Sequence, residues 1–449
     1  MASAQLTRTT GTPTSTDIGT ISFWMKRSVL DENNNYIISN YIGGNSGYIR
    51  FKSDNQLQAY SSVANDEKRT NRLFRDTHAW YHIVLRVDTS QSTASDRVRM
   101  YINGVQETSF VTNTNCAQNA DYDLFKASGS MRIGYIQSGT ATYFSGQLAH
   151  FHYADGQSYA PTVFGETDAT TGIWKPITSP SVTYGNQGFF LKFDNSGNMG
   201  LDSSGNSNNF TTSGTIIQNK DTPSNVFATW NSVDNYYQAA TLSNTNSTTT
   251  TVAAKLTPIK STLGVSKGKY YWEIKHSAVS SGSSYATIGI SSTQATSTTQ
   301  RGGSNANDYS YWYNGELRTG DSAITTGVGT YGVGDIIGVA LDLDNNKLYF
   351  SKNGTFVNSG DPTSGATGTG AMSITAPAST SLGAYFADAG FYDNTNTGTF
   401  QANFGNGYFG TTAVTSAQNP DDGIGIFEYD VPAGYRALCT KSINAEEYS

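Results

Sequence analysis

The segment NDYSYWYNGELRTG concentrates side chains suited to binding a ligand. It places Tyr309, Tyr311, Trp312 and Tyr313 directly before Asn314. Aromatic rings beside amide groups suit the faces of sugars or the anchor of a protein partner, because they join a rigid apolar area to a polar group. Alternation along a strand separates the three tyrosines from Trp312. If Trp312 is in the core, the tyrosines and Asn314 face a groove; the alternative is cross-strand packing of the tyrosines.

A second group of polar side chains lies in DNSGNMGLDSSGNSNNF, residues 194–210, where Asp194, Asn198, Asp202 and Asn206 carry side-chain oxygens. Calcium prefers such ligands, although no Glu closes a twelve-residue loop as in an EF-hand. Asp and Asn also hold turns by bonding their own backbone. We therefore expect turn chemistry here and no cofactor, with calcium as the one ion left open.

The five histidines offer little metal chemistry. His78 and His82 stand at i and i+4 of HAWYH, a strand-like segment in which these positions lie about 13 Å apart and cannot share an ion. His150 and His152 of HFH share one strand face, where chelation is feasible, but no third ligand is identifiable. A structural role is favoured for both pairs.

Enzymatic signatures are missing from the sequence. No Ser lies in a strand-to-helix nucleophile elbow, and no glycine-rich run is followed by the Lys-Ser/Thr of a phosphate loop. Glycoside hydrolysis needs two carboxylates across a cleft. Glu273 or Glu316 with an Asp could supply them, but nothing in the sequence shows that they converge. We therefore predict that the protein is not an enzyme.

Composition limits the classes of protein further. The 449 residues exceed one ordinary core, and the polarity, with a mean hydropathy of -0.42 and only 14% charged residues, comes from Ser, Thr, Asn and Gly. The net charge of -7 without a basic cluster argues against nucleic acid. Two cysteines form no disulfide framework. Neither a signal peptide nor a membrane-spanning run of about 20 apolar residues is visible, so we expect no membrane insertion.

Period-2 alternation dominates the chain, whereas helical periodicity is almost absent. In TISFWMKRS, Ile21, Phe23 and Met25 share one face and Trp24 takes the other. Similar short segments recur between Gly, Asn, Asp and Ser turns, which predicts an all-β fold of antiparallel sandwiches. The clearest helix candidate is the short APTVFGE, with Pro161 at a first helical position.

The turn-rich segment after residue 200 marks a domain boundary, which we place near residue 215. The expected domains are therefore residues 1–215 and 216–449. The run TLSNTNSTTTT, residues 241–251, has the appearance of a linker, but Thr is a good strand residue and an edge strand with its turn is favoured.

Two hairpins in different halves share one pattern, namely IVLRVDTSQSTASDRVRMYINGVQ (83–106) and VALDLDNNKLYFSKNGTF (339–356). Each reads as strand, polar turn, strand and Asn-Gly turn. Both central residues of a type I′ turn need positive φ, which Asn tolerates and Gly adopts freely. We expect the same hairpin at equivalent places in two related sandwiches.

The motifs of both halves resemble known domain families. The second half, roughly residues 222–440, resembles the SPRY domain through YYWEI, GDIIGVALDLD, LYFSKNG and a closing NFG. The first half resembles a LamG-like, concanavalin-type jelly roll through ISFWMKRS, WYHIVLRVD, VRMYINGVQ and FSGQLAHFHYADGQ. The resemblance implies two concanavalin-like sandwiches in tandem. SPRY domains bind partners through variable loops, which corresponds here to the region 301–316.

Further segments resemble virion structural proteins of tailed phages, of the tail-fibre or decoration type. They are DGQSYAPTVFGETDATTGIWKPI, GFFLKFDNSGNMGLDSSGNSNNF, DTPSNVFAT and VPAGYRALCTKSI. This resemblance implies a non-enzymatic protein of the virion surface, made in the cytoplasm of a bacterial host. It would bind a host surface glycan or receptor, or adhere to other virion proteins of the capsid or tail, in several copies on the particle.

Two alternatives remain open beside this reading. The first is a capsid or tail decoration or adaptor subunit with no host ligand. The second is a polysaccharide depolymerase, which a convergent carboxylate pair on the concave face of the first sandwich would support.

Overall fold

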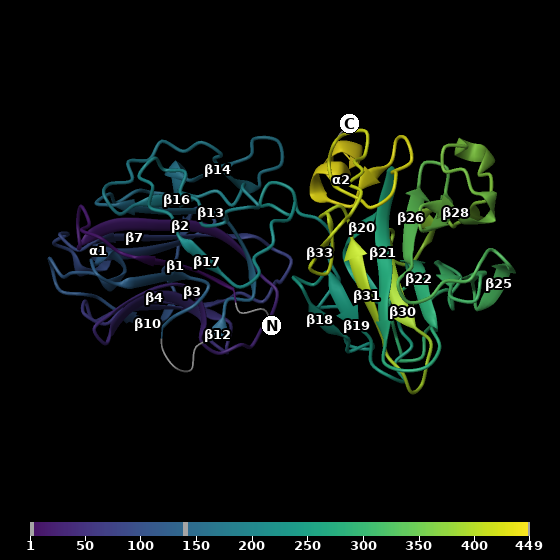
Figure 1. Cartoon of the computed structure of the whole chain (residues 1–449), viewed down its shortest axis with the longest axis horizontal. Helices are drawn as coiled ribbons and strands as arrows, with labels where there is room; N and C mark the ends of the chain where they lie inside the picture. The colour runs from purple at the N-terminus through teal and green to yellow at the C-terminus, as the bar shows by residue number, and fades with distance from the viewer. Residues whose placement is uncertain (1–3, 138–141, 448–449) are drawn as a thin grey trace. The chain divides into compact units, whose positions relative to one another are not determined.

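The computed structural model describes residues 4–137 and 142–447 (Figure 1). The chain divides into two compact units, Met1–Gln218 with Thr222–Ser224, and Asn219–Asp221 with Asn225–Ser449. Strands account for 41% of the residues and helices for 6%, which confirms the predicted all-β class.

Over its described residues, the first unit forms a nine-stranded and a six-stranded sheet. The nine-stranded sheet contains, in spatial order, β10 (Phe110–Thr114), β6 (Asp66–Leu73), β5 (Gln56–Ser61), β4 (Asn45–Phe51), β3 (Asn35–Ile42), β11 (Ser130–Ile133), β1 (Gln5–Thr9) and β17 (Thr211–Ser213), with β12 (Thr142–Tyr143) beside β3. The six-stranded sheet contains β16 (Phe189–Leu191), β13 (Gly146–Asp155), β2 (Ile18–Arg27), β7 (Tyr81–Asp88), β8 (Val98–Ile102) and β9 (Val105–Gln106). The short elements are α1 (Ala94–Arg97), η1 (Asp123–Phe125), η2 (Pro161–Val163), β14 (Gly165–Thr167) and β15 (Trp174–Pro176).

The core of the first unit lies between its two sheets. Ile21, Phe23 and Met25 of β2 are fully buried there, and Phe23 stacks on Phe151 of β13 with ring centroids 4.9 Å apart. The predicted alternation of β2 is therefore confirmed. The opposite face of β2 is also buried. There Trp24 stacks on His82, and the β14–β15 hairpin places Trp174 against the other side of the His82 ring.

The described part of the second unit repeats this plan with a further nine-stranded and six-stranded sheet. The first contains β18 (Thr241–Ser243), β19 (Thr248–Thr250), β31 (Gly398–Asn403), β21 (Lys269–Val279), β26 (Ile336–Asp342), β27 (Lys347–Lys352) and β28 (Thr355–Phe356), with β29 (Met372–Ser373) beside β27 and β34 (Arg436–Ala437) beside β21. The second contains β20 (Ile259–Val265), β30 (Tyr385–Phe391), β22 (Ala286–Ser291), β23 (Asp308–Trp312), β24 (Glu316–Thr319) and β25 (Ser322–Thr325). The remaining elements are β32 (Tyr408–Phe409), β33 (Thr412–Ala413), η3 (Val357–Ser359), η4 (Gly365–Thr367), η5 (Pro377–Ser379) and α2 (Thr440–Glu447).

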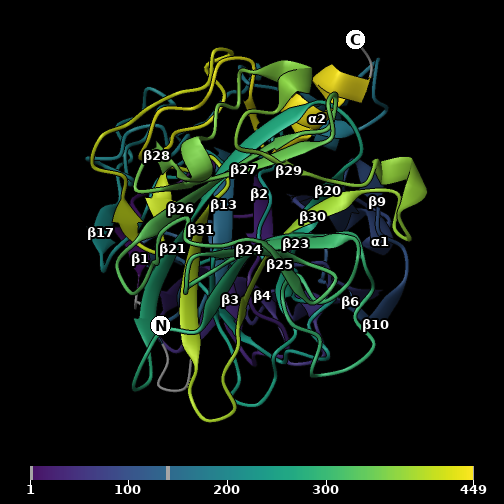
Figure 2. The ribbon, with the colours of Figure 1, turned by 90° about the vertical axis from the view of Figure 1, so that its right-hand side faces the viewer.

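Both faces of the central strands of the nine-stranded sheet in the second unit are buried. Figure 2 faces this unit and shows β21, β26 and β27 running across it. All seven residues of β26 are buried. On the side away from the main core, Tyr271 and Tyr349 form a second apolar cluster with Phe427 and Tyr435 of the C-terminal segment. This segment therefore acts as a cover for the sheet.

The two predicted Asn-Gly hairpins are confirmed. Asn103 and Gly104 have φ angles of 49° and 81°, and Asn353 and Gly354 have 48° and 82°. The first pair joins β8 to β9 at the end of a six-stranded sheet, and the second joins β27 to β28 at the end of a nine-stranded sheet. The two hairpins thus occupy corresponding positions at the ends of sheets in the two sandwiches.

Two smaller predictions, an edge strand within residues 241–251 and a short helical turn at Pro161, are also confirmed by the structure. The run 241–251 forms the antiparallel pair β18–β19 at a sheet edge, with Asn244, Thr245 and Asn246 in the left-handed region at the turn. Pro161 begins the single 3-10 turn η2. Cys116 and Cys439 are free and buried. Within residues 4–137 and 142–447, no helix has the length and apolar character needed to cross a membrane.

Glu273 on β21 holds the C-terminal segment to the sheet. Its two carboxyl oxygens accept hydrogen bonds from the backbone N–H groups of Glu428 and Tyr429, each at 2.9 Å. Tyr271 Oη and Asn403 Nδ2 donate two more, each at 3.2 Å. Burial nevertheless raises the pKa of Glu273 to about 7, since the desolvation outweighs the hydrogen bonds that favour the charged form.

Glu273→Ala should loosen the C-terminal segment. The substitution leaves two backbone N–H groups without their acceptor, so we expect the free energy of unfolding to fall by about 2–4 kcal/mol. Urea unfolding measures this change, and hydrogen exchange at the amides of Glu428 and Tyr429 should accelerate. The control is Glu316→Ala, which removes a partly exposed ion pair with Arg318 and should cost less than about 1 kcal/mol. Equal losses in both variants would contradict this role.

Candidate functional site

The aromatic site predicted around β23 is largely part of the core. Tyr309 and Tyr311 are 4% and 0% exposed. The Thr375 N–H donates to the Tyr309 hydroxyl at 3.0 Å, and the Tyr311 hydroxyl donates to the Gly329 carbonyl. The hypothesis that these two tyrosines face a groove is therefore wrong, because the face of β23 that carries them packs into the sandwich.

The other face of β23 is covered as well. Trp312 is 5% exposed, its indole N–H donates to the Gly302 carbonyl at 3.0 Å, and the Arg318 guanidinium lies 4.5 Å from its ring centroid. Just beyond the strand, Tyr313 is half-buried against Tyr285 and Asn314 is exposed. Only this last pair of the four predicted ligand-binding residues reaches the surface, and a ligand for it stays a prediction.

The calcium candidates of residues 194–210 do not form a cage. The Asp202 carboxylate accepts hydrogen bonds from the backbone N–H groups of Phe190, Ser204 and Asn208, at 2.8–2.9 Å. Asn206 donates to the carbonyls of Gly185 and Gly188. This arrangement corrects the calcium hypothesis for Asp202, since its oxygens already serve the turn.

The two remaining candidates for calcium lie at the surface. Asp194 and Asn198 are exposed. Asp202 in contrast is only 8% exposed. Asn206 is exposed as well, so Asp202 is the one buried member of the four oxygen-bearing side chains.

His82 is held as a neutral ring between two tryptophans. Its ring stacks on Trp24 with centroids 4.8 Å apart and on Trp174 at 6.0 Å. The Trp174 indole N–H donates to His82 Nδ1 at 3.0 Å. An indole can only donate, so the proton of His82 is on Nε2, which donates to Ser22 Oγ at 2.8 Å. Burial lowers the pKa of His82 to about 3.

The HFH pair packs against aromatic rings. His152 stacks on Phe190 at 3.9 Å, and its Nδ1 lies 2.9 Å from the Tyr184 hydroxyl. His150 lies beside the same phenylalanine at 6.1 Å, with φ 46° at an irregularity of β13. Burial lowers the pKa of both histidines. Among the residues that the structure describes, no group of three or more His, Cys, Asp or Glu side chains could hold a metal ion.

The carboxylates considered for hydrolysis belong to different sheets of the second unit. Glu273 lies on β21 of the nine-stranded sheet and serves the C-terminal segment. Glu316 lies on β24 of the six-stranded sheet and pairs with Arg318 at 2.6 Å. The structure therefore does not bring these two residues together.

A groove opens at one edge of the first unit, and we call it the edge groove. Its cavity volume is about 210 Å³. It lies where β8 and β9, at the end of one sheet, connect to β10, at the end of the other. The lining residues are Lys68, Ser95, Val98, Arg99, Met100, Gln106, Glu107, Thr108, Phe110, Asn113 and Asn115.

The edge groove combines unused hydrogen-bonding groups with one aromatic ring. The Nε atom of Arg99 is buried and lacks a hydrogen-bond partner, while its Nη2 pairs with Asp96 at 2.6 Å. Gln106 and Asn113 are exposed, and Phe110 is half-buried. Amide and guanidinium groups beside a ring can bind a polyhydroxylated molecule through directed hydrogen bonds and ring contact.

The walls of the edge groove are fixed by ion pairs. Glu107 is 7% exposed, pairs with Arg72 at 2.8 Å and accepts from the Ser109 N–H at 3.0 Å. Lys68 pairs with Asp66 at 2.9 Å. Sequence reasoning missed this groove, because its residues come from separate segments. The one feature of the sequence that could have indicated it was Arg99, a charged residue between the core residues Val98 and Met100.

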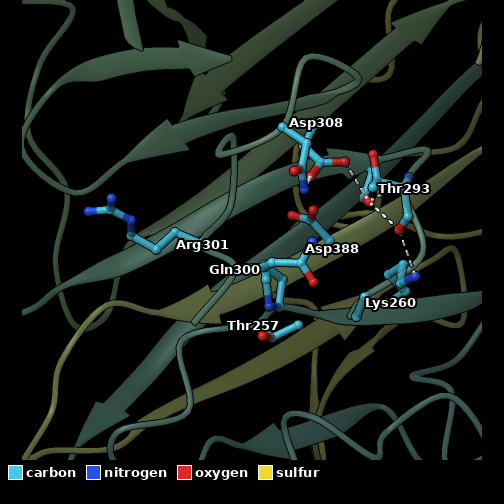
Figure 3. Close-up of a pocket in the computed structure, with 11 residues that line it drawn as sticks. Thr257, Lys260, Thr293, Gln300, Arg301, Asp308 and Asp388 are labelled. Carbon is cyan, nitrogen blue, oxygen red and sulfur yellow. Dashed lines mark hydrogen bonds between the residues drawn. The ribbon is translucent and has the colours of Figure 1, made fainter. Parts of the chain in front are cut away.

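A second, smaller pocket lies on the six-stranded sheet of the second unit. Figure 3 shows Asp388 at its centre, with Asp308 above and Gln300 below it. Its cavity volume is about 20 Å³, room for about one water molecule. Burial, reinforced by the nearby Asp308 carboxylate, raises the pKa of Asp388 well above its usual range. We call this cavity the Asp388 pocket.

Comparison with known proteins places a familiar domain in each unit. Residues 2–157 match the family model of the concanavalin A-like lectin/glucanases superfamily, and residues 269–376 match that of the SPRY domain. The two domain resemblances are therefore confirmed over these segments. Both are folds of the binding type, although the first superfamily's name also covers glucanases. No curated protein matches the chain in sequence.

Several solved structures are similar to parts of the chain. The SPRY domain of human HERC1 is 15% identical, covering 37% of this chain and 92% of that domain, with a TM-score of 0.28. A heptameric SAP-like pentraxin of Limulus polyphemus is 19% identical, covering 35% and 71%, with a TM-score of 0.27. A Bacteroides ovatus protein whose suggested role is carbohydrate binding is 15% identical, covering 48% and 57%, with a TM-score of 0.31.

The buried histidines of the first unit predict a loss of its stability in mild acid. His78, His82, His150 and His152 have pKa values lowered by burial when folded, so they take up protons more readily when unfolded. The contribution of these histidines to the free energy of unfolding is then complete above about pH 6.5. It is lost as pH falls below that value, by about 1.4 kcal/mol per pH unit for each histidine that stays neutral in the folded state.

Hydrogen exchange of peptides from β2 and β7 at pH 7, 6 and 5, corrected for intrinsic rates, measures this loss. His82→Gln should reduce the pH dependence of the free energy of unfolding by about 1.4 kcal/mol per pH unit, which corresponds to one proton. His276→Gln, in the second unit, is the matched control and should leave the slope in β2 and β7 unchanged. A pH-independent stability of these strands would contradict the prediction.

Proposed function

We propose that the chain is a non-enzymatic protein of a tailed-phage virion surface that binds a host surface glycan through the edge groove of its first unit. The observation that supports this most is the groove itself. It joins the Arg99 side chain and the exposed amides of Gln106 and Asn113 to the Phe110 ring. Its volume of about 210 Å³ is below the roughly 300–1,000 Å³ of drug-sized pockets and suits a single sugar ring.

The virion role rests on the segment resemblances in the sequence. In this proposal, residues 1–215 form the LamG-like module and residues 216–449 the SPRY-like module. The protein is made in the cytoplasm of a bacterial host and joins capsid or tail proteins at the virion surface. Several copies on one particle would engage an envelope polysaccharide together, so a weak single site is sufficient.

A decoration or adaptor subunit without a host ligand is the second candidate. One observation favours it, namely that Val233 and Tyr236 of the second unit are 77% and 83% exposed. Exposed apolar side chains close together in sequence fit a contact with a neighbouring protein. For a depolymerase, Glu273 and Glu316 of the second unit lie on different sheets, and a convergent carboxylate pair on the first sandwich would be needed to support that role.

Arg99→Ala should weaken glycan binding by the full chain. We expect at least a 10-fold rise in Kd, since the substitution removes a charged donor from the groove. A panel of bacterial envelope polysaccharides on an array identifies the ligand, and calorimetry measures Kd. Asn113→Ala should act in the same direction. Arg132→Ala is the matched control, because Arg132 lies on β11 and bonds Gln5, outside the groove.

Three outcomes would contradict parts of this proposal. Absence of binding to every polysaccharide would favour the decoration role. Binding that Arg99→Ala leaves unchanged would place the glycan site elsewhere. Release of reducing ends from a bound polysaccharide would show a depolymerase.

A further inference from the structure

The Asp388 pocket is formed by neighbouring strands and the loop that follows β22. Asp388 of β30 stands opposite Lys260 of β20 on one side and Gly289 of β22 on the other. Asp308 begins β23 opposite Ser291, the last residue of β22. Their side chains lie on the face opposite the core, and loop residues from Thr293 to Asn305 complete the lining.

Asp388 is buried without a hydrogen-bond partner. The residue is 1% exposed, and both of its carboxyl oxygens lack a partner. It is the one buried carboxyl group with two unpartnered oxygens among the residues that the structure describes. Buried polar groups are normally paired, so this group indicates a partner that the protein chain itself does not supply.

The neighbouring side chains bond other groups and leave Asp388 without a partner. Asp308 accepts hydrogen bonds from Ser291 Oγ at 2.8 Å and from Asn305 Nδ2 at 2.7 Å. Lys260 Nζ donates to the Thr293 carbonyl at 3.1 Å and pairs with Asp234 at 3.0 Å.

The charges around the pocket do not balance. Asp388, Asp308 and Asp234 bring three carboxylates to one ammonium group, that of Lys260. Arg301 is paired with Asp321 at 3.0 Å and adds no net charge. Full ionisation of the site would therefore leave an excess of two negative charges. Burial and this excess raise the pKa of Asp388, so a cation that binds there takes the place of its proton.

The size of the cavity limits what can supply the missing charge. About 20 Å³ holds one particle of the size of a water molecule, which excludes a sugar ring or a long basic side chain. Oxygen ligands select hard cations, and calcium in particular accepts carboxylates in one- or two-oxygen contacts together with hydroxyls and water.

We propose that the Asp388 pocket binds a divalent, oxygen-seeking cation of the calcium class, with Asp388 as its main ligand and Asp308 as a second carboxylate. The cation would join β30 and β23 to the loop that covers Trp312. This site is in the second unit and is separate from the residues 194–206 for which the sequence left calcium open.

Calcium addition to the full chain, after treatment with EDTA and gel filtration, tests this proposal. Calorimetric titration with CaCl2 should show saturable binding. At 100 times Kd, the unfolding transition of the second unit should rise by about 5–10 °C. Asp388→Asn should abolish the rise. In EDTA this variant should unfold at the wild-type temperature or above it, because it removes a buried unpaired carboxyl group.

Asp430→Asn is the matched control, since Asp430 is an exposed acid of the same unit and should keep the full calcium response. If Asp388→Asn fails to fold, Asp308→Asn replaces it, with an expected loss of at least 10-fold in calcium affinity. A transition that calcium, magnesium and sodium all leave unchanged would overturn the proposal. A calcium response that persists in Asp388→Asn would overturn it as well.

Discussion

Buried carboxylates that accept backbone hydrogen bonds hold the loops of this protein to its sheets. Asp155 is fully buried and accepts from the backbone N–H groups of Thr14, Ser15 and Gln187, at 2.7–3.2 Å. Glu273 serves the C-terminal segment of the second unit in the same way. With only 14% charged residues, the chain has few such groups. Loops carry many N–H groups that strands do not satisfy, so each buried carboxylate orders a segment that would otherwise lack acceptors.

The loops held in this way cover the outer faces of the sheets. In the first unit, the β14–β15 hairpin brings Trp174 onto His82. In the second unit, the C-terminal segment packs Phe427 on Tyr271 at 5.1 Å. Flat sheet faces, where a lectin-like sandwich could bind, are thereby partly occupied by the chain itself. Binding groups then concentrate where sheets end, as in the edge groove.

The sequence predicted the strands, the Asn-Gly turns and the two sandwiches, since these depend on local periodicity and on the conformational freedom of Asn and Gly. It did not predict that both faces of β23 are buried. Alternation correctly separated Tyr309 and Tyr311 from Trp312, but periodicity assigns side chains to faces and does not show what covers each face. The core that encloses the tyrosines comes from distant parts of the chain, and the loop that covers Trp312, although only ten residues away in sequence, has no periodicity that shows where it folds.

The same limit explains why both candidate sites escaped detection. The edge groove is assembled from Lys68, the segment 95–100 and the segment 106–115, and no one of them is a motif. Asp388 in FADAGF reads as an ordinary polar position of an alternating strand. That Asp388 lacks a hydrogen-bond partner can be seen only in the folded structure, because Lys260 pairs with Asp234 and Asp308 bonds Ser291. In a protein whose other buried carboxylates order loops, a carboxylate without a backbone donor is the position where an external cation would perform that task.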